Sequence, residues 1–316
     1  MTFHPDSLPD LTGKVFIVTG GSSGIGYYTV ARLAQHGAHV YMCARSPIKG
    51  NGAIADVKTL YPQARITLLV MDHLSLASVV SAAKLFLSEE TTLHGLVNNA
   101  GIMATPFEMT RDGHEAQWQT KYLAHWVLTS HLLPLLLRTS KVLPPGSVRI
   151  VNLSSVGHYS APRGGINFAD TSLPNGTGMA RYGQSKLANV LHAKTLHALY
   201  GPDSPSSRSG TGELWTAAVH PGLVKSAIGE RAEFPFGARA LVEVFAALGA
   251  RVGGDKGSWT SVFCAASPAM RRAQSGSYYQ RIAEAGWQSS MARDPKLAAE
   301  LEESTQKEMR RGGWVE

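Results

Sequence analysis

A tyrosine and a lysine that could act as an acid–base pair lie four positions apart in the sequence, at Tyr182 and Lys186. On a helix this spacing places both side chains on one face, where the ammonium would favour the phenolate form of the tyrosine. Such a phenol can donate a proton to a carbonyl oxygen while a hydride reaches the carbon. Ser155, at the end of a predicted strand, would donate a hydrogen bond to the same oxygen. Each residue alone also suits an ordinary helix surface or turn, so the predicted catalytic site depends on their combination.

A glycine-rich segment at residues 19–26, TGGSSGIG, predicts where the hydride comes from. It lies between an apolar run at 15–18, typical of a buried strand, and a helical pattern at 24–36. Glycines at such a turn let the backbone approach a pyrophosphate, and the helix N-terminus favours the negative charge. An ordinary glycine-rich turn is the alternative, but the order strand, turn, helix is typical of a dinucleotide site.

The second predicted strand, residues 39–44, is followed by Arg45, where an NAD site usually has an aspartate or glutamate. A carboxylate there would repel the 2′-phosphate of NADP, whereas a guanidinium can bind it with two charge-assisted hydrogen bonds. A solvated charge at the strand end is the alternative, but it leaves the missing carboxylate unexplained. We therefore predict NADP(H) as the cofactor.

Short apolar runs alternate with helical patterns along the chain, as in proteins built from βαβ units. The predicted strands lie at residues 15–18, 39–44, 66–71, 95–99, 147–154, 215–220 and 277–279. The predicted helices lie at residues 24–36, 75–90, 113–137, 179–200 and 295–311. The pattern predicts an α/β fold, a single-domain Rossmann-type doubly wound parallel sheet of seven strands.

The single domain would span residues 1–316. Its cofactor-binding part is predicted at about 11–155 and its catalytic and substrate part at about 155–310, with a helical substrate lid at about 224–255. The segment 201–212 combines Pro, Gly and Ser with few apolar residues, so it is predicted to be a solvent-exposed loop.

The composition fits a compact soluble enzyme. Of the 316 residues 44% are hydrophobic, and 30 Lys and Arg against 23 Asp and Glu leave a net charge of +7. The basic residues are scattered, so no nucleic-acid partner is expected. Cys43 and Cys264 are the only cysteines, which favours a reducing compartment, and no metal site is predicted. No signal peptide or membrane span is predicted, so we expect a cytoplasmic protein.

Five motifs in order give the chain a resemblance to the short-chain dehydrogenases/reductases over about residues 11–310. They are TGGSSGIG at 19–26, NNAG at 98–101, Ser154-Ser155, YGQSK at 182–186 and His220-Pro221-Gly222. The chain is similar to the subgroup that includes retinol-dehydrogenase-like and protochlorophyllide-reductase-like members.

The resemblance implies a place around the dinucleotide for each motif. The phosphates would contact the turn formed by Gly20, Ser22, Ser23, Gly24, Ile25 and Gly26. Asp72 would meet the adenine, while Asn98 and the backbone of Ala100 and Gly101 would flank the adenosine ribose. The nicotinamide carboxamide would be bordered by Pro221, Gly222 and Val224, and the nicotinamide ribose held by Tyr182 and Lys186.

The chain departs from the family pattern at Lys121, where the family usually has an asparagine whose backbone holds a water that connects the active-site lysine to solvent. Three interpretations are open: the carbonyl of residue 121 still holds the water, the Lys121 side chain replaces part of the relay, or the protein has acquired another task. A second cation near Lys186 is costly in a dry site, so we expect Lys121 to bend towards solvent or to find an acid partner. Lys121→Asn is expected to keep or raise turnover, and Tyr182→Phe to abolish it.

The interval from Ser155 to Tyr182 is long and resembles the expanded loop of the retinol-dehydrogenase-like members. Its larger side chains could line an apolar pocket or simply pack within the loop: His158, Tyr159, Phe168 and Met179. The same alternatives apply in the lid to Phe234, Phe236, Leu241, Phe245 and Leu248. The expected substrate is a medium-sized apolar carbonyl compound, for example a polycyclic one, or the corresponding alcohol.

Two other functions remain open. An enzyme of this fold could use Tyr182 for non-redox acid–base chemistry such as dehydration, isomerisation or cyclisation, which Lys121 suggests. A non-catalytic NADP-binding regulator is the second alternative, and the intact Ser155, Tyr182 and Lys186 disfavour it. Family members often pair through the helices near 113–137 and 179–200, so the resemblance implies a homodimer or homotetramer.

Overall fold

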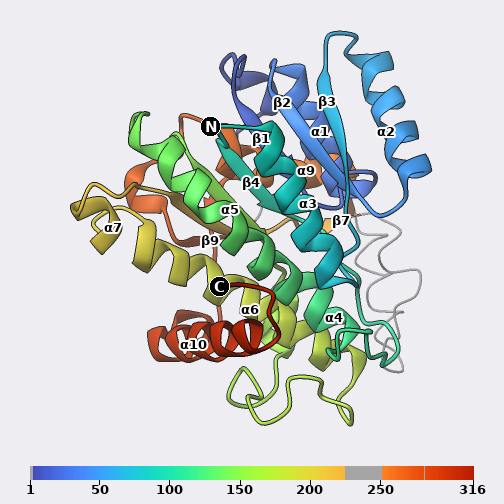
Figure 1. Ribbon diagram of the computed structural model, residues 1–316, viewed down its shortest axis with the longest axis vertical. Helices are drawn as coiled ribbons and strands as arrows, with labels where there is room; N and C mark the ends of the chain where they lie inside the picture. The colour runs from blue at the N-terminus through green and yellow to red at the C-terminus, as the bar shows by residue number, and fades with distance from the viewer. Residues whose placement is uncertain (1–2, 225–250, 281) are drawn as a thin grey trace.

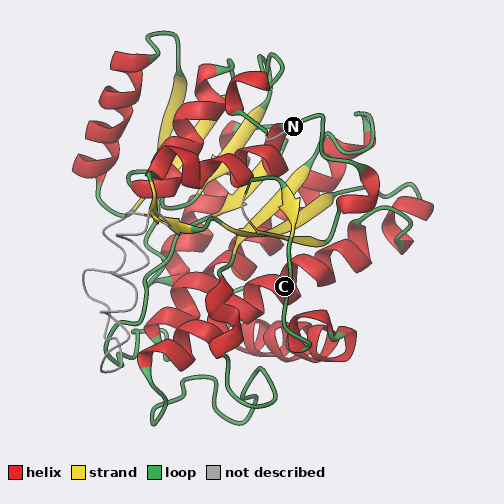
Figure 2. Cartoon of the chain, turned by 180° about the vertical axis from the view of Figure 1, so that it is seen from behind, coloured by secondary structure: helices red, strands yellow, loops and turns green. Residues whose placement is uncertain are grey.

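A twisted parallel sheet forms the centre of the computed structural model, which describes residues 3–224, 251–280 and 282–316 (Figures 1 and 2). The strands lie in the order β10-β9-β6-β5-β4-β1-β2-β3. Seven are parallel: β1 (Val15–Val18), β2 (His39–Ala44), β3 (Arg65–Val70), β4 (Gly95–Asn98), β5 (Arg149–Leu153), β6 (Trp215–His220) and β9 (Ser277–Gln280). The predicted strands are thereby confirmed. An eighth strand, β10 (Glu284–Ala285), pairs antiparallel with β9 and was not predicted, because two residues carry no recognisable pattern.

Helices cover both faces of the sheet, which confirms the predicted doubly wound fold in one domain (Figure 1). One face carries α1 (Gly24–Gln35), α2 (Pro47–Leu60) and α9 (Gly254–Ala266). The other carries α3 (Leu76–Glu89), α5 (Ala124–Lys141) and α6 (Gly178–Tyr200), with α10 (Pro295–Arg311) packed on α6. Among the described helices, none is both long and apolar enough to cross a membrane.

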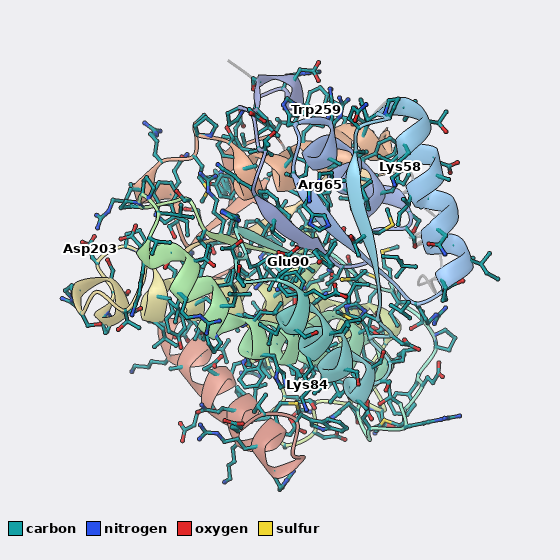
Figure 3. The ribbon with its side chains drawn as sticks, turned by 45° about the horizontal axis from the view of Figure 1, so that its top comes forward. Lys58, Arg65, Lys84, Glu90, Asp203 and Trp259 are labelled. Carbon is teal, nitrogen blue, oxygen red and sulfur yellow. The ribbon has the colours of Figure 1, made fainter. Side chains whose placement is uncertain are left out.

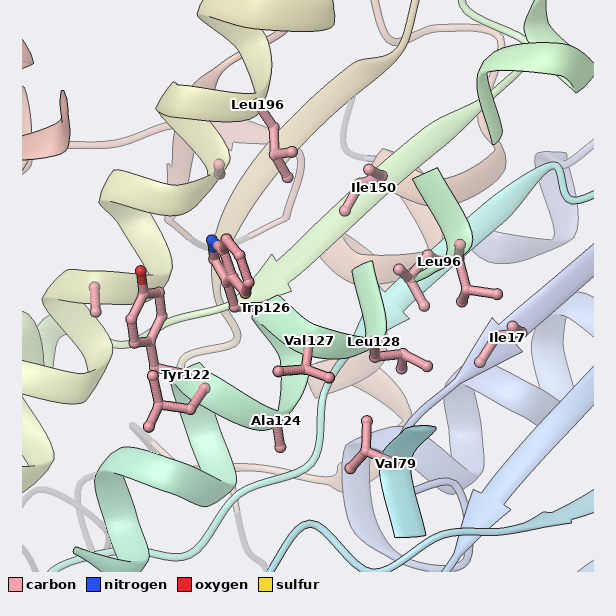
Figure 4. Packing of buried hydrophobic residues seen from close by; sticks show 14 of the residues in the cluster. Ile17, Val79, Leu96, Tyr122, Ala124, Trp126, Val127, Leu128, Ile150 and Leu196 are labelled. Carbon is pink, nitrogen blue, oxygen red and sulfur yellow. The ribbon is translucent and has the colours of Figure 1, made fainter. Parts of the chain in front are cut away.

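Alternation along the strands divides the core between the two faces. On β1, Ile17 belongs to the cluster under α3, α5 and α6, whereas Phe16 and Val18 belong to the cluster under α1, α2 and α9. This is the two-residue period of a strand buried on both sides. Figure 4 shows the first cluster, where Ile17, Leu96 and Ile150 of the sheet meet side chains of the covering helices.

The helix α2 was not predicted, and its sequence shows why. Its segment contains Gly50 and Gly52, which lower helix propensity, and its apolar residues give a weak helical pattern. The helix is set instead by its start: Ser46 is the N-cap, with its hydroxyl accepting from the Lys49 N–H, and Pro47 occupies the first turn.

The prediction that residues 201–212 form a solvent-exposed loop is wrong in part. It contains a short helix, α7 (Pro205–Arg208), and the side chains of Ser204 and Ser206 are buried. Ser206 donates to the carbonyl of Gly212 at 2.8 Å, and Asp203, labelled at the surface in Figure 3, forms a two-fold ion pair with Arg272. Polar composition predicted exposure, but these hydrogen bonds satisfy the polar groups internally.

The chain enters and leaves the predicted lid through a small two-stranded parallel sheet. Its strands are β7 (Leu223–Val224) and β8 (Arg251–Val252). The predicted lid side chains lie outside the described residues: Phe234, Phe236, Leu241, Phe245 and Leu248.

Candidate active site

The predicted site residues follow the carboxyl ends of parallel strands, so they gather at one edge of the sheet. The strand order reverses between β1 and β4, and there the turn after β1 meets the NNAG segment after β4. A Cβ on Gly20, whose φ is +62°, would lie 2.9 Å from the Cα of Ala100. A Cβ on Gly26 would collide with the carbonyl oxygen of Gly20. Glycine is therefore required at both positions for the two segments to approach this closely.

The glycine turn fits the phosphates of a dinucleotide. Helix α1 begins at Gly24, with φ of +54°, directly after the turn. Its N-cap residue Ser23 is exposed and makes no side-chain cap hydrogen bond in the described structure, so the amides of the first turn remain available to an anion. Ser22 and Ile25 are half-buried beside them.

Hydrogen bonds of Thr19 and Asn99 fix the glycine turn against the NNAG segment. The Thr19 hydroxyl accepts from the N–H groups of Asn99 and Ala100 at 2.8 and 2.9 Å, and the Asn99 amide donates to the Thr19 carbonyl at 2.7 Å. The Asn98 side chain points into the sheet instead and donates to Asn152 at 2.8 Å. Sequence reasoning singled out Asn98 and missed Asn99, although both belong to the same motif.

The predicted adenosine contacts follow β2 and β3. Arg45 is exposed at the end of β2, and its guanidinium forms no ion pair with any described residue. Asp72, after β3, is half-buried, and its carboxylate accepts from the Leu74 N–H at 3.0 Å.

The segment after β6 returns to the glycine turn. Pro221 and Gly222 are half-buried there. A Cβ on Gly257 would lie 2.6 Å from the Cγ2 of Val224 and 3.5 Å from the Cγ1 of Ile25, so α9 brings Val224 close to the turn.

The Ser155 and Tyr182 side chains meet, as the sequence predicted. Ser155 follows β5, Tyr182 lies in the second turn of α6, and both side chains border Gly157, where an added Cβ would collide with Tyr182 Cε1 and lie 3.4 Å from Ser155 Oγ. Ser155 Oγ also accepts from the Gly157 N–H at 3.0 Å, which fixes its rotamer. Tyr182 is only 7% exposed. Its burial raises the pKa of Tyr182, and the neighbouring Ser155 side chain opposes that shift.

Lys186 lies one turn after Tyr182, but its ammonium is directed at the sheet. Its Nζ donates to the carbonyl of Leu153 at 2.7 Å and lies 5.9 Å from the centroid of the Tyr182 ring. Burial lowers the pKa of Lys186 to about 7. Burial raises the pKa of Tyr182 in this structure, and Lys186 Nζ is bonded to the sheet, so the predicted stabilisation of the phenolate by Lys186 stays a prediction.

Lys121 occupies a π-helical turn. The predicted helix at 113–137 begins as α4 (Ala116–Trp118), widens at Gln119–Leu123 and continues as α5. The Lys121 side chain is fully buried, and its Nζ donates to the Ile102 carbonyl at 2.9 Å and to Gln117 Oε1 at 2.8 Å. The expectation that Lys121 turns to solvent or binds an acid is therefore wrong: two neutral oxygens take the place of a carboxylate.

The nearby carboxylate belongs to a different pair. Glu115 Oε1 lies 3.4 Å from the Nε of Arg181, and both side chains are buried. Arg181 also donates to the carbonyls of Gly176 and Thr105, at 2.6 and 3.3 Å. These contacts fix the start of α6, and with it Tyr182.

The carbonyl of Lys121 is linked to the glycine turn through His125. The His125 Nδ1 donates to the Lys121 carbonyl at 3.0 Å, which leaves Nε2 to accept from the Thr19 hydroxyl at 2.8 Å. Burial keeps the pKa of His125 well below its usual range, as this neutral tautomer requires. Sequence reasoning missed His125.

The long loop before Tyr182 supports Ser155. His158 is fully buried, donates from Nδ1 to the Ser155 carbonyl at 2.7 Å and accepts from the Ser289 N–H at 3.1 Å. Phe168 packs against the core, as the packing alternative predicted, whereas Tyr159 is 51% exposed. Met179 is half-buried in the first turn of α6.

Comparison with known proteins agrees with this geometry. A family model for the short chain dehydrogenases matches residues 14–169. The short-chain dehydrogenase/reductase drtF of Aspergillus calidoustus is 48% identical over 310 residues, 97% of each chain. Human retinol dehydrogenase 12 is 34% identical over 293 residues, covering 92% of this chain and 84% of that protein.

A solved structure is similar in fold to most of the chain. The crystal structure of an uncharacterized protein from Mycobacterium paratuberculosis has a TM-score of 0.72 and 25% identity, with 97% of each chain covered. The sequence relatives, the strand order and the meeting of Ser155 with Tyr182 agree. The chain therefore belongs to the short-chain dehydrogenase/reductase family of oxidoreductases and is retinol-dehydrogenase-like.

Proposed function

We propose that this protein uses NADPH to reduce a ketone or aldehyde on a medium-sized apolar molecule, or catalyses the reverse oxidation. The observation that carries the proposal is the approach of the Ser155 and Tyr182 side chains beside Gly157, with Lys186 one turn away, at the sheet edge where the dinucleotide turn lies. Buried titratable groups with shifted pKa values that gather at one edge of a sheet are typical of functional sites, and both Tyr182 and Lys186 are of this kind.

The cofactor would be held by the turn at residues 19–26 and by the NNAG segment. A bound nicotinamide dinucleotide supplies the hydride. Arg45 supports NADP(H) over NAD(H), because its exposed guanidinium has no partner among the described residues and is free to bind a 2′-phosphate. Asp72, Asn98, Pro221 and Gly222 remain proposed contacts.

The protein's own groups would handle the proton and the developing charge. In reduction, Tyr182 transfers its hydroxyl proton to the substrate oxygen and is left as a phenolate. Ser155 donates a hydrogen bond to the same oxygen and stabilises the negative charge that develops there. Lys186 carries a cation within the site and, turned from the Leu153 carbonyl, would hold the nicotinamide ribose.

Apolar side chains around the site favour an apolar substrate. Four exposed apolar side chains lie in segments next to the site residues: Val156 and Tyr159 follow Ser155, Leu223 follows β6, and Phe107 lies against Arg181, the neighbour of Tyr182. The retinol dehydrogenase among the relatives is named for an apolar alcohol, which supports the same class.

We also propose that the protein acts in the cytoplasm.

Any homodimer or homotetramer is proposed to form through a surface away from α5 and α6. Helix α10 and the residues after it lie across these helices: Trp126 donates to Glu302 at 2.9 Å, and His131 bonds to the Trp314 carbonyl at 2.9 Å. The face that the resemblance assigned to subunit pairing is thus occupied by the chain itself.

The test is a panel of apolar ketones and aldehydes with NADPH, in which loss of nicotinamide absorbance is measured for the wild type and for Tyr182→Phe. Reduction by the wild type and a loss of at least about 1,000-fold in kcat for the variant are expected, because proton transfer is removed. Equal rates would contradict the assignment of Tyr182. Products formed without nicotinamide turnover would instead indicate non-redox acid–base chemistry.

A further inference from the structure

The buried ammonium of Lys121 lies closer to the Tyr182 ring than that of Lys186 does. The distances from Nζ to the ring centroid are 4.4 Å and 5.9 Å. We propose that Lys121 is a positioning residue that stabilises the phenolate form of Tyr182 from the face of its ring, and so sets the pH range in which Tyr182 exchanges its proton. The catalytic consequence rests on the proposed function, but the interaction itself can be measured without a substrate.

The fold directs this side chain at Tyr182. Lys121 lies at the middle of the π-helical turn, a distortion that often occurs at functional sites. Gly101 leaves room for the aliphatic stem, since a Cβ there would lie 3.3 Å from the Cγ of Lys121 and 3.9 Å from the Nζ of Lys186. The two lysines therefore border the same glycine on the side of Tyr182.

The two acceptors of Lys121 hold its ammonium without neutralising it. Ile102 contributes a backbone carbonyl and Gln117 an amide oxygen. Gln117 is itself fixed, because the Ala104 N–H donates to its Oε1 at 2.9 Å and its Nε2 donates to the Gly178 carbonyl at 3.1 Å. The cation is thus kept in place by a network that carries no opposite charge.

The charged groups around Lys121 come from two elements, α4 and α6, and are predominantly positive. Glu115, at the start of α4, favours the charged form of Lys121 but is paired with Arg181 of α6. Arg181 and Lys186, both on α6, disfavour it, and burial is the largest influence, so the pKa of Lys121 lies well below its usual range. A negative charge on Tyr182 would relieve this excess of positive charge.

Ionisation of Tyr182 and protonation of Lys121 therefore support each other. When Tyr182 gives its hydroxyl proton to the substrate oxygen, the O–H bond breaks and its electron pair stays on the phenolate, whose ring lies 4.4 Å from Lys121 Nζ and 5.9 Å from Lys186 Nζ. A neutral side chain at position 121 would leave the phenolate with Lys186 alone. Since reduction uses the protonated phenol, such a variant keeps or raises reductive turnover and loses oxidative turnover at neutral pH.

The first test compares the tyrosinate titration of the wild type with that of Lys121→Met. Subtracting the ultraviolet titration of Tyr182→Phe isolates Tyr182 among the ten tyrosines. The pKa of Tyr182 is expected to rise by about one unit in Lys121→Met, the size of a desolvated cation–π contact. Lys84→Met removes an exposed lysine of α3, labelled in Figure 3, and is expected to leave that pKa unchanged. Equal Tyr182 titrations in the wild type and Lys121→Met would overturn the proposal.

The second test uses Lys121→Asn, which carries the residue usual in the family and replaces Lys121→Met if that variant fails to fold. The alkaline limit of carbonyl reduction should move up by the same amount as the titration. A shifted titration with no reduction of any carbonyl compound would remove the proposed function and leave this inference intact. Confirmed reduction with identical pH profiles for the wild type and Lys121→Asn would overturn this inference and leave the proposed function intact.

Discussion

Gly157 is expected to be a requirement of the catalytic geometry, because the Tyr182 ring packs directly on its backbone. A Cβ on Gly157 would lie 2.9 Å from the Cδ1 of Tyr182, closer still to Cε1, and 3.4 Å from the Oγ of Ser155. Carbon atoms in contact normally lie about 3.5–4.0 Å apart, so in Gly157→Ala the ring must withdraw by roughly 1 Å. A displacement of that size at a reacting group can lower kcat by about 100-fold. The overpacking itself should cost about 1–3 kcal/mol of the free energy of unfolding.

Two measurements check this reasoning on Gly157→Ala: kcat for carbonyl reduction with NADPH, and the free energy of unfolding in urea. Gly52→Ala is the matched control, since a Cβ there meets nothing within 4 Å on the exposed side of α2. It should keep full activity and gain about 0.5–1 kcal/mol of stability. In a Tyr182→Ala background the destabilisation by Gly157→Ala should largely disappear. Wild-type kcat in Gly157→Ala, or the same destabilisation in both backgrounds, would refute the packing argument.

Two further predictions concern the cofactor and stability. Arg45→Asp should weaken NADPH binding by about 10- to 100-fold, because a charge-assisted contact is replaced by repulsion. Calorimetric titration with NADPH and with NADH would detect the change. Unchanged NADPH affinity would mean that the 2′-phosphate binds elsewhere. Burial lowers the pKa of His73 and His94 from 6.5 to about 4, so the unfolded chain binds more protons in that range. Each histidine should therefore stabilise the folded protein above pH 6.5, and this contribution is lost as the pH falls towards 4. Between about pH 7 and about pH 5 the free energy of unfolding should fall by about 2 kcal/mol for each histidine. Equal free energies of unfolding in urea at the two pH values would contradict this prediction.

Much of the fold was predictable because it depends on local patterns. The apolar runs of β1, β2 and β4 are buried on both faces, and such strands read as continuous hydrophobic segments in the sequence. The errors have local causes too. Gly50 and Gly52 obscured α2, and the polar segment around Ser204 and Ser206 folds by hydrogen bonds that composition does not indicate.

The candidate site was predictable only where a motif carries it. Tyr182 and Lys186 lie on one helix, so their spacing alone brought them together. Nothing in the sequence indicated three other residues that shape the site. Asn99 and His125 both bond to the distant Thr19, and Gly157 makes room for the Tyr182 ring, so their partners are known only from the fold. The same holds for Lys121. As a charged residue it was expected to reach solvent or an acid, but the fold surrounds its ammonium with two neutral oxygens.

The end of β5 explains how catalytic groups separated by a long loop keep their geometry. The Leu153 carbonyl accepts from Lys186 Nζ at 2.7 Å and from Asn189 Nδ2 at 2.8 Å, and Ser154 Oγ donates to the Lys186 carbonyl at 2.7 Å. Helix α6 is therefore located by the strand that carries Ser155, whatever the length of the chain between them. Because these contacts, with those of Gly157, His158 and Gly176 at the two ends of the loop, fix Tyr182 against Ser155, the middle of the loop is free to vary in length and sequence.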